Sequence, residues 1–89
     1  MNVLQDTEPV ARKHYSCAAC HVWLLSNYGQ ADLSPDDWLI VEGAMADFWK
    51  IKPGQKYRKI VYKDGADLIT IRARLDMDGL CQRLELFDD

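Results

Sequence analysis

The chain has 89 residues, of which 48% are hydrophobic, 10% aromatic and 28% charged, and its formal net charge is −3. This length predicts one domain, and the apolar and aromatic content excludes an intrinsically disordered chain. No apolar run approaches the length of about 20 residues that a membrane-spanning helix needs, so we expect no membrane contact.

Residues 1–9 predict a flexible tail, followed by a single domain over residues 10–89. The tail lacks the basic and apolar regions of a secretory signal peptide. We therefore expect a cytoplasmic protein with reduced thiols. In that compartment, three cysteines favour metal or redox chemistry over disulfide bonds, and their odd number points the same way.

The first half of the domain predicts a cysteine turn and two helices. Residues 10–21 resemble an extended segment that enters a tight turn, and residues 22–28 a short helix. A stronger helix is predicted over residues 35–49, because Ser34 is a preferred N-cap and a proline and two aspartates follow it. Helical spacing predicts that this helix buries Trp38, Val41, Met45, Phe48 and Trp49.

The second half predicts a β-hairpin and a final helix. Residues 56–63 and 67–75 alternate in polarity, and Asp64-Gly65 between them is a strong hairpin signal. A helix over residues 76–87 follows. Its expected buried positions are Met77, Leu80, Cys81, Leu84 and Phe87. This order of elements predicts an α+β fold.

The cysteines predict a structural zinc site. A Cys-x-x-Cys turn directs two thiolates at one ion, and a third can come from the last helix. Asp78 precedes Cys81 by three residues, so both side chains share one helical face. We expect Zn²⁺ bound by Cys17, Cys20, Cys81 and Asp78, with His14 as the alternative fourth ligand and His21 ranked below both.

Three other interpretations of these cysteines are open. In the first, the chain holds no metal and buries the cysteines, since free cysteine packs as a small hydrophobe. The string Cys-Ala-Ala-Cys-His matches the c-type haem attachment signature, with Met45 or Met77 as distal ligand, but no export signal supports it. A thioredoxin-like redox pair would need a preceding strand within a βαβ unit, which the sequence does not predict.

The spacing of these motifs resembles a group of small zinc-binding proteins common in phages and prophages. The shared pattern is R-K-H-x-x-C-x-x-C (residues 12–20), I-x-x-G-x-x-Y (residues 51–57), a hairpin and a late Cys81. The resemblance implies a treble-clef-like zinc domain made of a knuckle, an inserted helix, a β-hairpin and a C-terminal helix. It also implies a mobile-element origin. Where the group has histidine in H-x-x-C, this chain has Asp78.

A basic segment is the main candidate for binding. Residues 50–63 contain six basic and no acidic residues, whereas the rest of the chain has five basic and 14 acidic ones. Basic and aromatic side chains can contact phosphates and bases, but a solvated sheet face that discourages edge pairing is the favoured alternative. The candidate nucleic-acid or partner-binding residues are Lys52, Lys56, Tyr57, Arg58, Lys59 and Lys63, with Arg72, Arg74, Tyr62 and Trp49 as further contacts.

The sequence contains no recognisable set of catalytic residues. The predicted hairpin has no histidine, which a ββα-metal nuclease would require there. We expect a non-enzymatic, zinc-stabilised interaction protein that binds and modulates or inhibits a host macromolecule, with a host protein as the favoured partner. The resemblance and the small size of the chain further imply a partner in host defence or transcription. Some of its aromatic residues would then remain exposed. The alternative is a small nucleic-acid-binding regulator that uses the basic segment.

Overall fold

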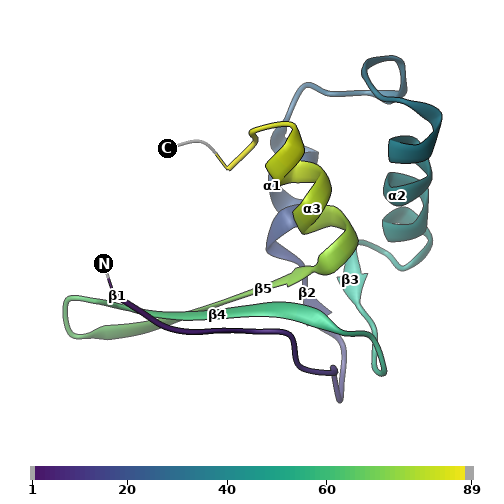
Figure 1. Cartoon of the computed structure of the whole chain (residues 1–89). Coiled ribbons are helices and arrows are strands. Elements are labelled where there is room, and N and C mark those ends of the chain that lie inside the picture. Colours follow the sequence, from purple (N-terminus) through teal and green to yellow (C-terminus); the bar gives the residue numbers. More distant parts are fainter. Residues whose placement is uncertain (1, 88–89) are drawn as a thin grey trace.

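The fold is α+β, with an antiparallel sheet on one side and helices on the other (Figure 1). It is seen in a computed structural model that describes residues 2–87. The sheet extends past the helices at one end, and α1 and α3 cover its other end. The elements in chain order are β1 (Asn2–Thr7), β2 (Tyr15–Ser16), α1 (Ala18–Leu25), the 3-10 turn η1 (Gln30–Asp32), α2 (Pro35–Ala46), β3 (Lys50–Ile51), β4 (Tyr57–Asp64), β5 (Asp67–Arg74) and α3 (Leu75–Arg83).

The main sheet has the strand order β1-β4-β5, and all neighbours are antiparallel. Its first strand corrects our prediction that residues 1–9 form a flexible tail, because residues 2–7 pair with β4. The segment shows no simple alternation that would mark a strand. Its partner lies far along the chain, so only the folded arrangement supplies the hydrogen bonds that order it.

The hairpin of β4 and β5 confirms the prediction made from Asp64-Gly65. The two strands pair from Asp64 with Asp67 to Tyr57 with Arg74, and Gly65 has a φ of +63°, which glycine tolerates without strain. Residues paired directly across an antiparallel ladder share one face. The register therefore creates an apolar face, containing Val3, Ile60, Tyr62, Ile69, Ile71 and Ala73, and a basic face, containing Lys59, Lys63 and Arg72.

The I-x-x-G-x-x-Y motif has a structural role. Ile51 is fully buried in β3, and the ring of Tyr57 is buried beside Tyr15. Between them Gly54 has a φ of +90° and donates its N–H to the carbonyl of Ala11 at 2.8 Å. The motif thus joins the second, two-stranded sheet of β2 and β3 to the start of β4.

Helix α2 begins as predicted, since the Ser34 hydroxyl accepts the N–H of Asp37 at 3.2 Å. It ends at Ala46, three residues earlier than predicted. The chain there enters the left-handed region at Phe48 and Trp49 (φ 57° and 61°), and the Trp49 N–H donates to the carbonyl of Ala44. This is the bond pattern of a Schellman termination.

Because α2 ends three residues before the predicted position, its buried side chains differ from the predicted set. Val41 and Ala44 lie in the core, and Trp38 and Trp49 pack against it. Our prediction was wrong for two members of the stripe, because Met45 and Phe48 are exposed. The turn after Ala46 rotates Phe48 away from the helix face that contacts the core.

The other two helices meet above the sheet and complete the core. Helix α1 starts at Ala18 instead of near residue 22, because Cys17 caps it. Helix α3 buries Met77, Leu80 and Cys81 as predicted, but it ends at Arg83, before the predicted residue 87. Within residues 2–87, no helix is both long and apolar enough to cross a membrane.

Candidate functional site

The cysteine pair lies at the start of α1. Cys17 is the N-cap, and its Sγ accepts the backbone N–H of Cys20 at 3.2 Å. The same Sγ accepts the backbone N–H of Arg74, the last residue of β5, also at 3.2 Å. Both cysteines are buried. One sulfur atom thus joins the N-terminus of α1 to the end of the sheet.

The two thiols of this pair differ in acidity. A hydrogen bond from the Cys20 thiol, together with the N–H groups of Arg74 and Cys20, lowers the pKa of Cys17 to about 7 despite its burial. The same hydrogen bond and the neighbouring sulfur raise the pKa of Cys20 far above its usual range. Cys17 is the sulfur that the surroundings favour as a thiolate.

The third cysteine approaches the pair from α3. Cys81 is fully buried, and its Sγ donates to the carbonyl of Ala19, between the other two cysteines, at 3.5 Å. Burial raises the pKa of Cys81 to about 11. Among residues 2–87, no three His, Cys, Asp or Glu side chains form a group that could hold a metal ion. The three buried cysteines therefore belong to the N-terminus of α1 and to α3, two helices that contact each other.

The candidates for a fourth ligand lie elsewhere. The carboxylate of Asp78 accepts from Arg58 at 3.2 Å and from Gln82 at 2.7 Å. His14 is exposed, three residues before the pair in sequence. His21 is exposed as well but lines a groove together with Cys17. Both bonds of Asp78 end on its Oδ2, so neither of them engages Oδ1.

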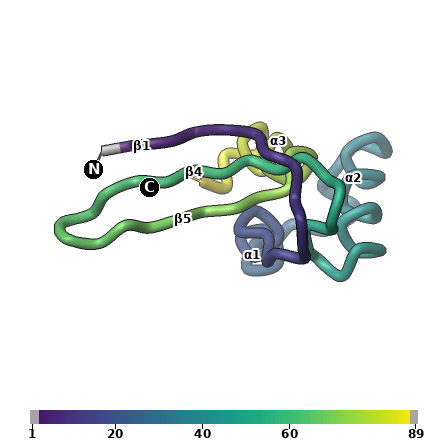
Figure 2. The backbone as a smooth tube through the Cα atoms, turned by 90° about the horizontal axis from the view of Figure 1, so that it is seen from below, coloured from purple at the N-terminus to yellow at the C-terminus, as the bar shows by residue number. Residues whose placement is uncertain are grey.

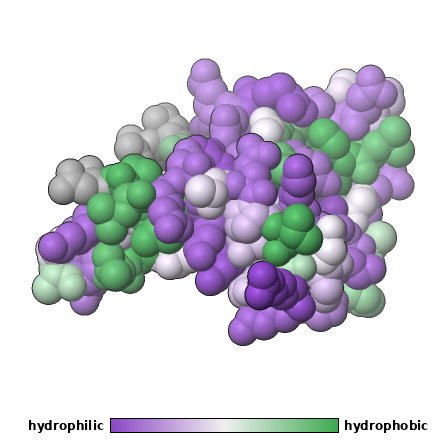
Figure 3. Space-filling model, turned by 60° about the horizontal axis from the view of Figure 1, so that its bottom comes forward, coloured by the Kyte–Doolittle hydropathy of each residue, from purple (hydrophilic) through white to green (hydrophobic). Residues whose placement is uncertain are grey.

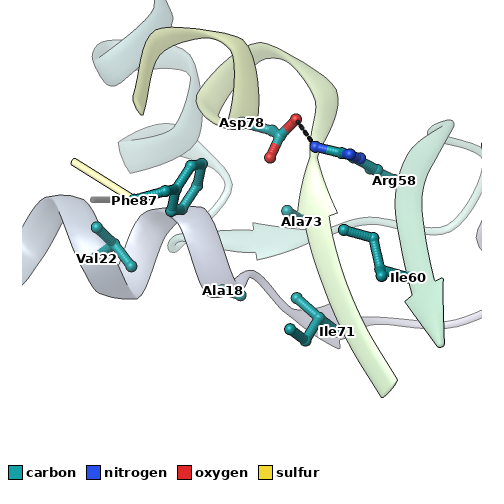
Figure 4. A pocket seen from close by; sticks show the side chains of 8 residues that line it. All are labelled: Ala18, Val22, Arg58, Ile60, Ile71, Ala73, Asp78 and Phe87. Atoms are coloured by element: carbon teal, nitrogen blue, oxygen red, sulfur yellow. Dashed lines mark hydrogen bonds and ion pairs between the residues drawn. The ribbon is translucent and has the colours of Figure 1, made fainter. Parts of the chain in front are cut away.

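Asp78 and Arg58 close one end of an apolar cavity of about 380 Å³ (Figure 4). The cavity lies between the apolar face of the sheet and the two helices, and Phe87 stands over it. Arg58 also binds Asp6 of β1 through two nitrogens, at 3.1 and 2.9 Å. These carboxylates raise the pKa of Arg58 and so hold its charge inside the fold.

The predicted binding residues therefore fall into separate groups. Arg58 is held by two carboxylates, Lys52 pairs with Asp47 at 3.2 Å, and Tyr57 is buried. Lys59 lies directly opposite Arg72 on the basic face, and the exposed Lys63 lies farther along it. Lys56 is exposed at the entry to β4. Of the basic segment, the structure brings only Lys59 and Lys63 together with Arg72 on one sheet face.

Arg74 has a role that the sequence analysis missed. We predicted a phosphate contact, but its side chain is buried and binds Asp47 at 2.6 Å, Asp76 at 3.0 Å and the carbonyl of Lys50 at 3.1 Å. These bonds join the end of α2, β3 and the start of α3. Arg74 lowers the pKa of Asp47 to about 2, with help from Gln55 and Lys52. Only the fold brings these groups together, so no sequence signal could have marked Arg74.

The end of the sheet that extends past the helices forms a distinct surface. We call residues 2–5, 61–64 and 67–70 the sheet tip. Its exposed fractions are 61% for Val3, 56% for Leu4 and 67% for Leu68. A contiguous apolar patch is visible at this end of the molecule (Figure 3). Tyr28 is also exposed, whereas Trp23 is buried and Trp38 and Trp49 are partly buried.

The chain was also compared with known proteins. No family model, no curated protein and no solved structure matches it.

Proposed function

We propose that this protein is a non-enzymatic, zinc-stabilised interaction protein that binds and modulates a host protein. The observation that carries the proposal is the sheet tip, which presents large apolar side chains beyond the helices. Contiguous exposed apolar surface is characteristic of protein–protein contact sites. The proposed phage origin and treble-clef-like character rest on the short motifs between Arg12 and Cys81.

In this proposal, Cys17, Cys20 and Cys81 hold a structural zinc ion. Thiolates are the preferred ligands of Zn²⁺, and the burial of all three sulfurs where α1 meets α3 supports the assignment. Asp78 or His14 would supply the fourth donor. The ion would fix the two helices over one end of the sheet and so hold the tip in position.

The partner surface would combine the apolar tip with a basic rim. Lys59 and Lys63 share the basic face of the sheet, with Lys63 inside the tip and Lys59 beside it. Neither lysine has a carboxylate within ion-pair distance among residues 2–87. A host protein with an acidic border around an apolar contact would complement this surface.

Site-specific photo-crosslinking tests this function. A photoreactive amino acid is placed at Leu68 in the tip and, as a matched control, at Leu39, which is 63% exposed on α2. In host extract, the variant at Leu68 should crosslink one defined protein, and excess unlabelled wild-type chain should compete. The variant at Leu39 should give no such product. Equal labelling from both positions, or none from Leu68, would refute the proposed surface.

The second candidate is a nucleic-acid-binding regulator, which the pairing of Lys59 with Arg72 on an open sheet face favours. The double variant Lys59→Glu/Lys63→Glu separates the two functions. A regulator should bind single- or double-stranded oligonucleotides with a steep salt dependence that this variant abolishes. Arg58 is unsuitable for such a test, because reversing its charge would oppose Asp6 and Asp78.

A further inference from the structure

The hydrogen bond between Arg74 and Cys17 shows which way the strand edge faces. The backbone N–H of Arg74 points away from β4, toward Cys17 on the outer side of β5. Along an antiparallel strand, residues alternate between bonding the partner and facing outward. Arg72, Thr70 and Leu68 therefore direct their backbone N–H and C=O groups toward the same outer side as Arg74.

This outer edge has no strand paired with it among residues 2–87. The sheet ends at β5, and viewed from below, α1 lies beside the C-terminal part of β5 (Figure 2), where β2 and β3 also contact the strand. Thr70 and Leu68 are exposed. Proteins usually protect such an edge with proline, a bulge or a covering segment, whereas here the bulge lies in β1, on the opposite side of the sheet.

A groove follows the same edge toward the helices. Its volume is about 580 Å³, and Thr70, Ile71 and Arg72 of β5 form one wall. The other wall consists of β2 and the first turns of α1, including Ser16, Cys17, Ala18, His21 and Val22. An extended chain that runs along the outward N–H and C=O groups of β5 would enter this groove.

At this edge, the two faces of the sheet carry different side chains. On the basic face, the Arg72 guanidinium lies over the Tyr15 ring, 4.4 Å from its centroid, opposite Lys59. Among residues 2–87 it has no ion pair, and its Nε has no hydrogen-bond acceptor. On the apolar face, the neighbouring β5 side chains are Ile69 and Ile71.

We propose that β5 accepts an extended segment of the partner protein as a fourth strand, and that this segment alternates apolar and acidic side chains. The backbone of the segment would bond Leu68, Thr70 and Arg72. Its apolar side chains would lie beside Ile69 and Ile71, and its carboxylates beside Arg72, with Lys59 one strand farther away on the same face. The inference rests on the proposed function and specifies the class of partner segment.

A second copy of the chain is a poorer occupant of this edge. Pairing two β5 edges would place Arg72, Lys59 and Lys63 of both copies on one continuous face. That face would have no added carboxylates, and like charges at these spacings repel within a Debye length. Charge complementarity therefore favours an acidic partner strand over self-association.

The test uses the complete ¹⁵N-labelled chain and a capped heptapeptide that alternates valine and glutamate. With saturating peptide, hydrogen exchange of the Leu68, Thr70 and Arg72 amides should slow at least ten-fold. The same peptide methylated at every backbone nitrogen should not bind. A version with lysine in place of glutamate should bind at least ten-fold more weakly.

Two variants probe the edge itself. Thr70→Pro removes one outward N–H without taking a bond from the β4–β5 ladder, and it should weaken peptide binding at least ten-fold. Thr70→Val keeps that N–H and should bind normally. Unprotected edge amides, equal binding of the lysine peptide, protection by a thymidine oligonucleotide instead, or a dimer that Thr70→Pro dissociates would each overturn the proposal.

The same variant separates this inference from the proposed function. If Thr70→Pro still crosslinks the host protein through Leu68, strand addition is wrong although the interaction function stands. If the wild-type chain crosslinks no host protein but binds the peptide along β5, the edge is a strand-binding site and the proposed function is wrong.

Discussion

The backbone N–H of Arg74 and the N–H of Cys20 both donate to Sγ of Cys17, each at 3.2 Å. The first bond fixes the end of β5, and the second caps α1. Because the site is buried, neither N–H can turn to water if the sulfur is removed. Cys17 therefore stabilises the fold through its hydrogen bonds independently of any metal ion.

This role predicts different effects for two substitutions, measured by urea unfolding in the presence of a chelator. Cys17→Ala leaves two buried donors without an acceptor and should lower the free energy of unfolding by about 2 kcal/mol. Cys17→Ser keeps an acceptor oxygen and should lose about half as much. Equal losses in the two variants would contradict the capping role.

A second prediction is that the three cysteines bind one zinc ion per chain. Protein purified without added metal should contain one zinc per chain by elemental analysis, and Cys20→Ser or Cys81→Ser should abolish it. Removal of zinc should lower the midpoint of thermal unfolding, because a bound ion stabilises only the folded state.

The fourth ligand can be assigned in the same assay. Asp78→Asn should weaken zinc retention if Asp78 is a ligand, and His14→Ala if His14 is. A wild-type chain that folds fully without metal would refute the zinc assignment. The absorption spectrum of a covalently attached haem would refute it as well.

Local sequence signals predicted much of this fold. The Ser34 cap and the Asp64-Gly65 turn each act within a few residues, and both occur as expected. The alternating polarity of the two strands predicted the apolar and basic faces of the hairpin. The observed register keeps paired residues on the same face, so these faces form as expected. These signals, with the final helix, were enough to predict an α+β fold.

The structural features that could not be predicted from the sequence depend on contacts between segments far apart in the chain. The strand at residues 2–7 exists because β4 offers it an edge, and Arg74 is buried because Asp47 and Asp76 surround it. The cysteine motif predicted a candidate metal site from sequence alone. The bond from Arg74 to Cys17 was not predicted, because it depends on where β5 ends.

The ion pair of Asp47 with buried Arg74 predicts a specific acid sensitivity. The folded state holds the pKa of Asp47 at about 2, below its usual 3.8, so folding favours the charged carboxylate. This stabilisation is complete above about pH 4 and disappears as the pH falls to about 2. It amounts to about 2 kcal/mol.

The variant Asp47→Asn isolates this contribution from those of other carboxylates. At pH 7 it should lower the free energy of unfolding by about 2 kcal/mol, because Arg74 keeps its buried charge with one partner fewer. Between pH 4 and pH 2 the wild type should lose that much more stability than the variant. Parallel stability curves over this interval would show that the pair contributes nothing.

The end of α2 predicts a stabilising substitution. Phe48 occupies the left-handed position of a Schellman termination, with a φ of 57°, and its side chain is 79% exposed. Glycine adopts this conformation without the clash that a Cβ creates. Phe48→Gly should therefore raise the free energy of unfolding by about 1 kcal/mol, because it relieves strain and removes little packing.

Trp49 is the matched control, since its φ of 61° is similar but its ring packs against the core. Trp49→Gly should destabilise the protein by about 2 kcal/mol, because the lost burial outweighs the relieved strain. Chemical denaturation of both variants checks the pair of predictions. If Phe48→Gly also destabilises the fold, Phe48 makes contacts that offset its strained backbone, and the end of α2 is set by packing and not by conformational preference.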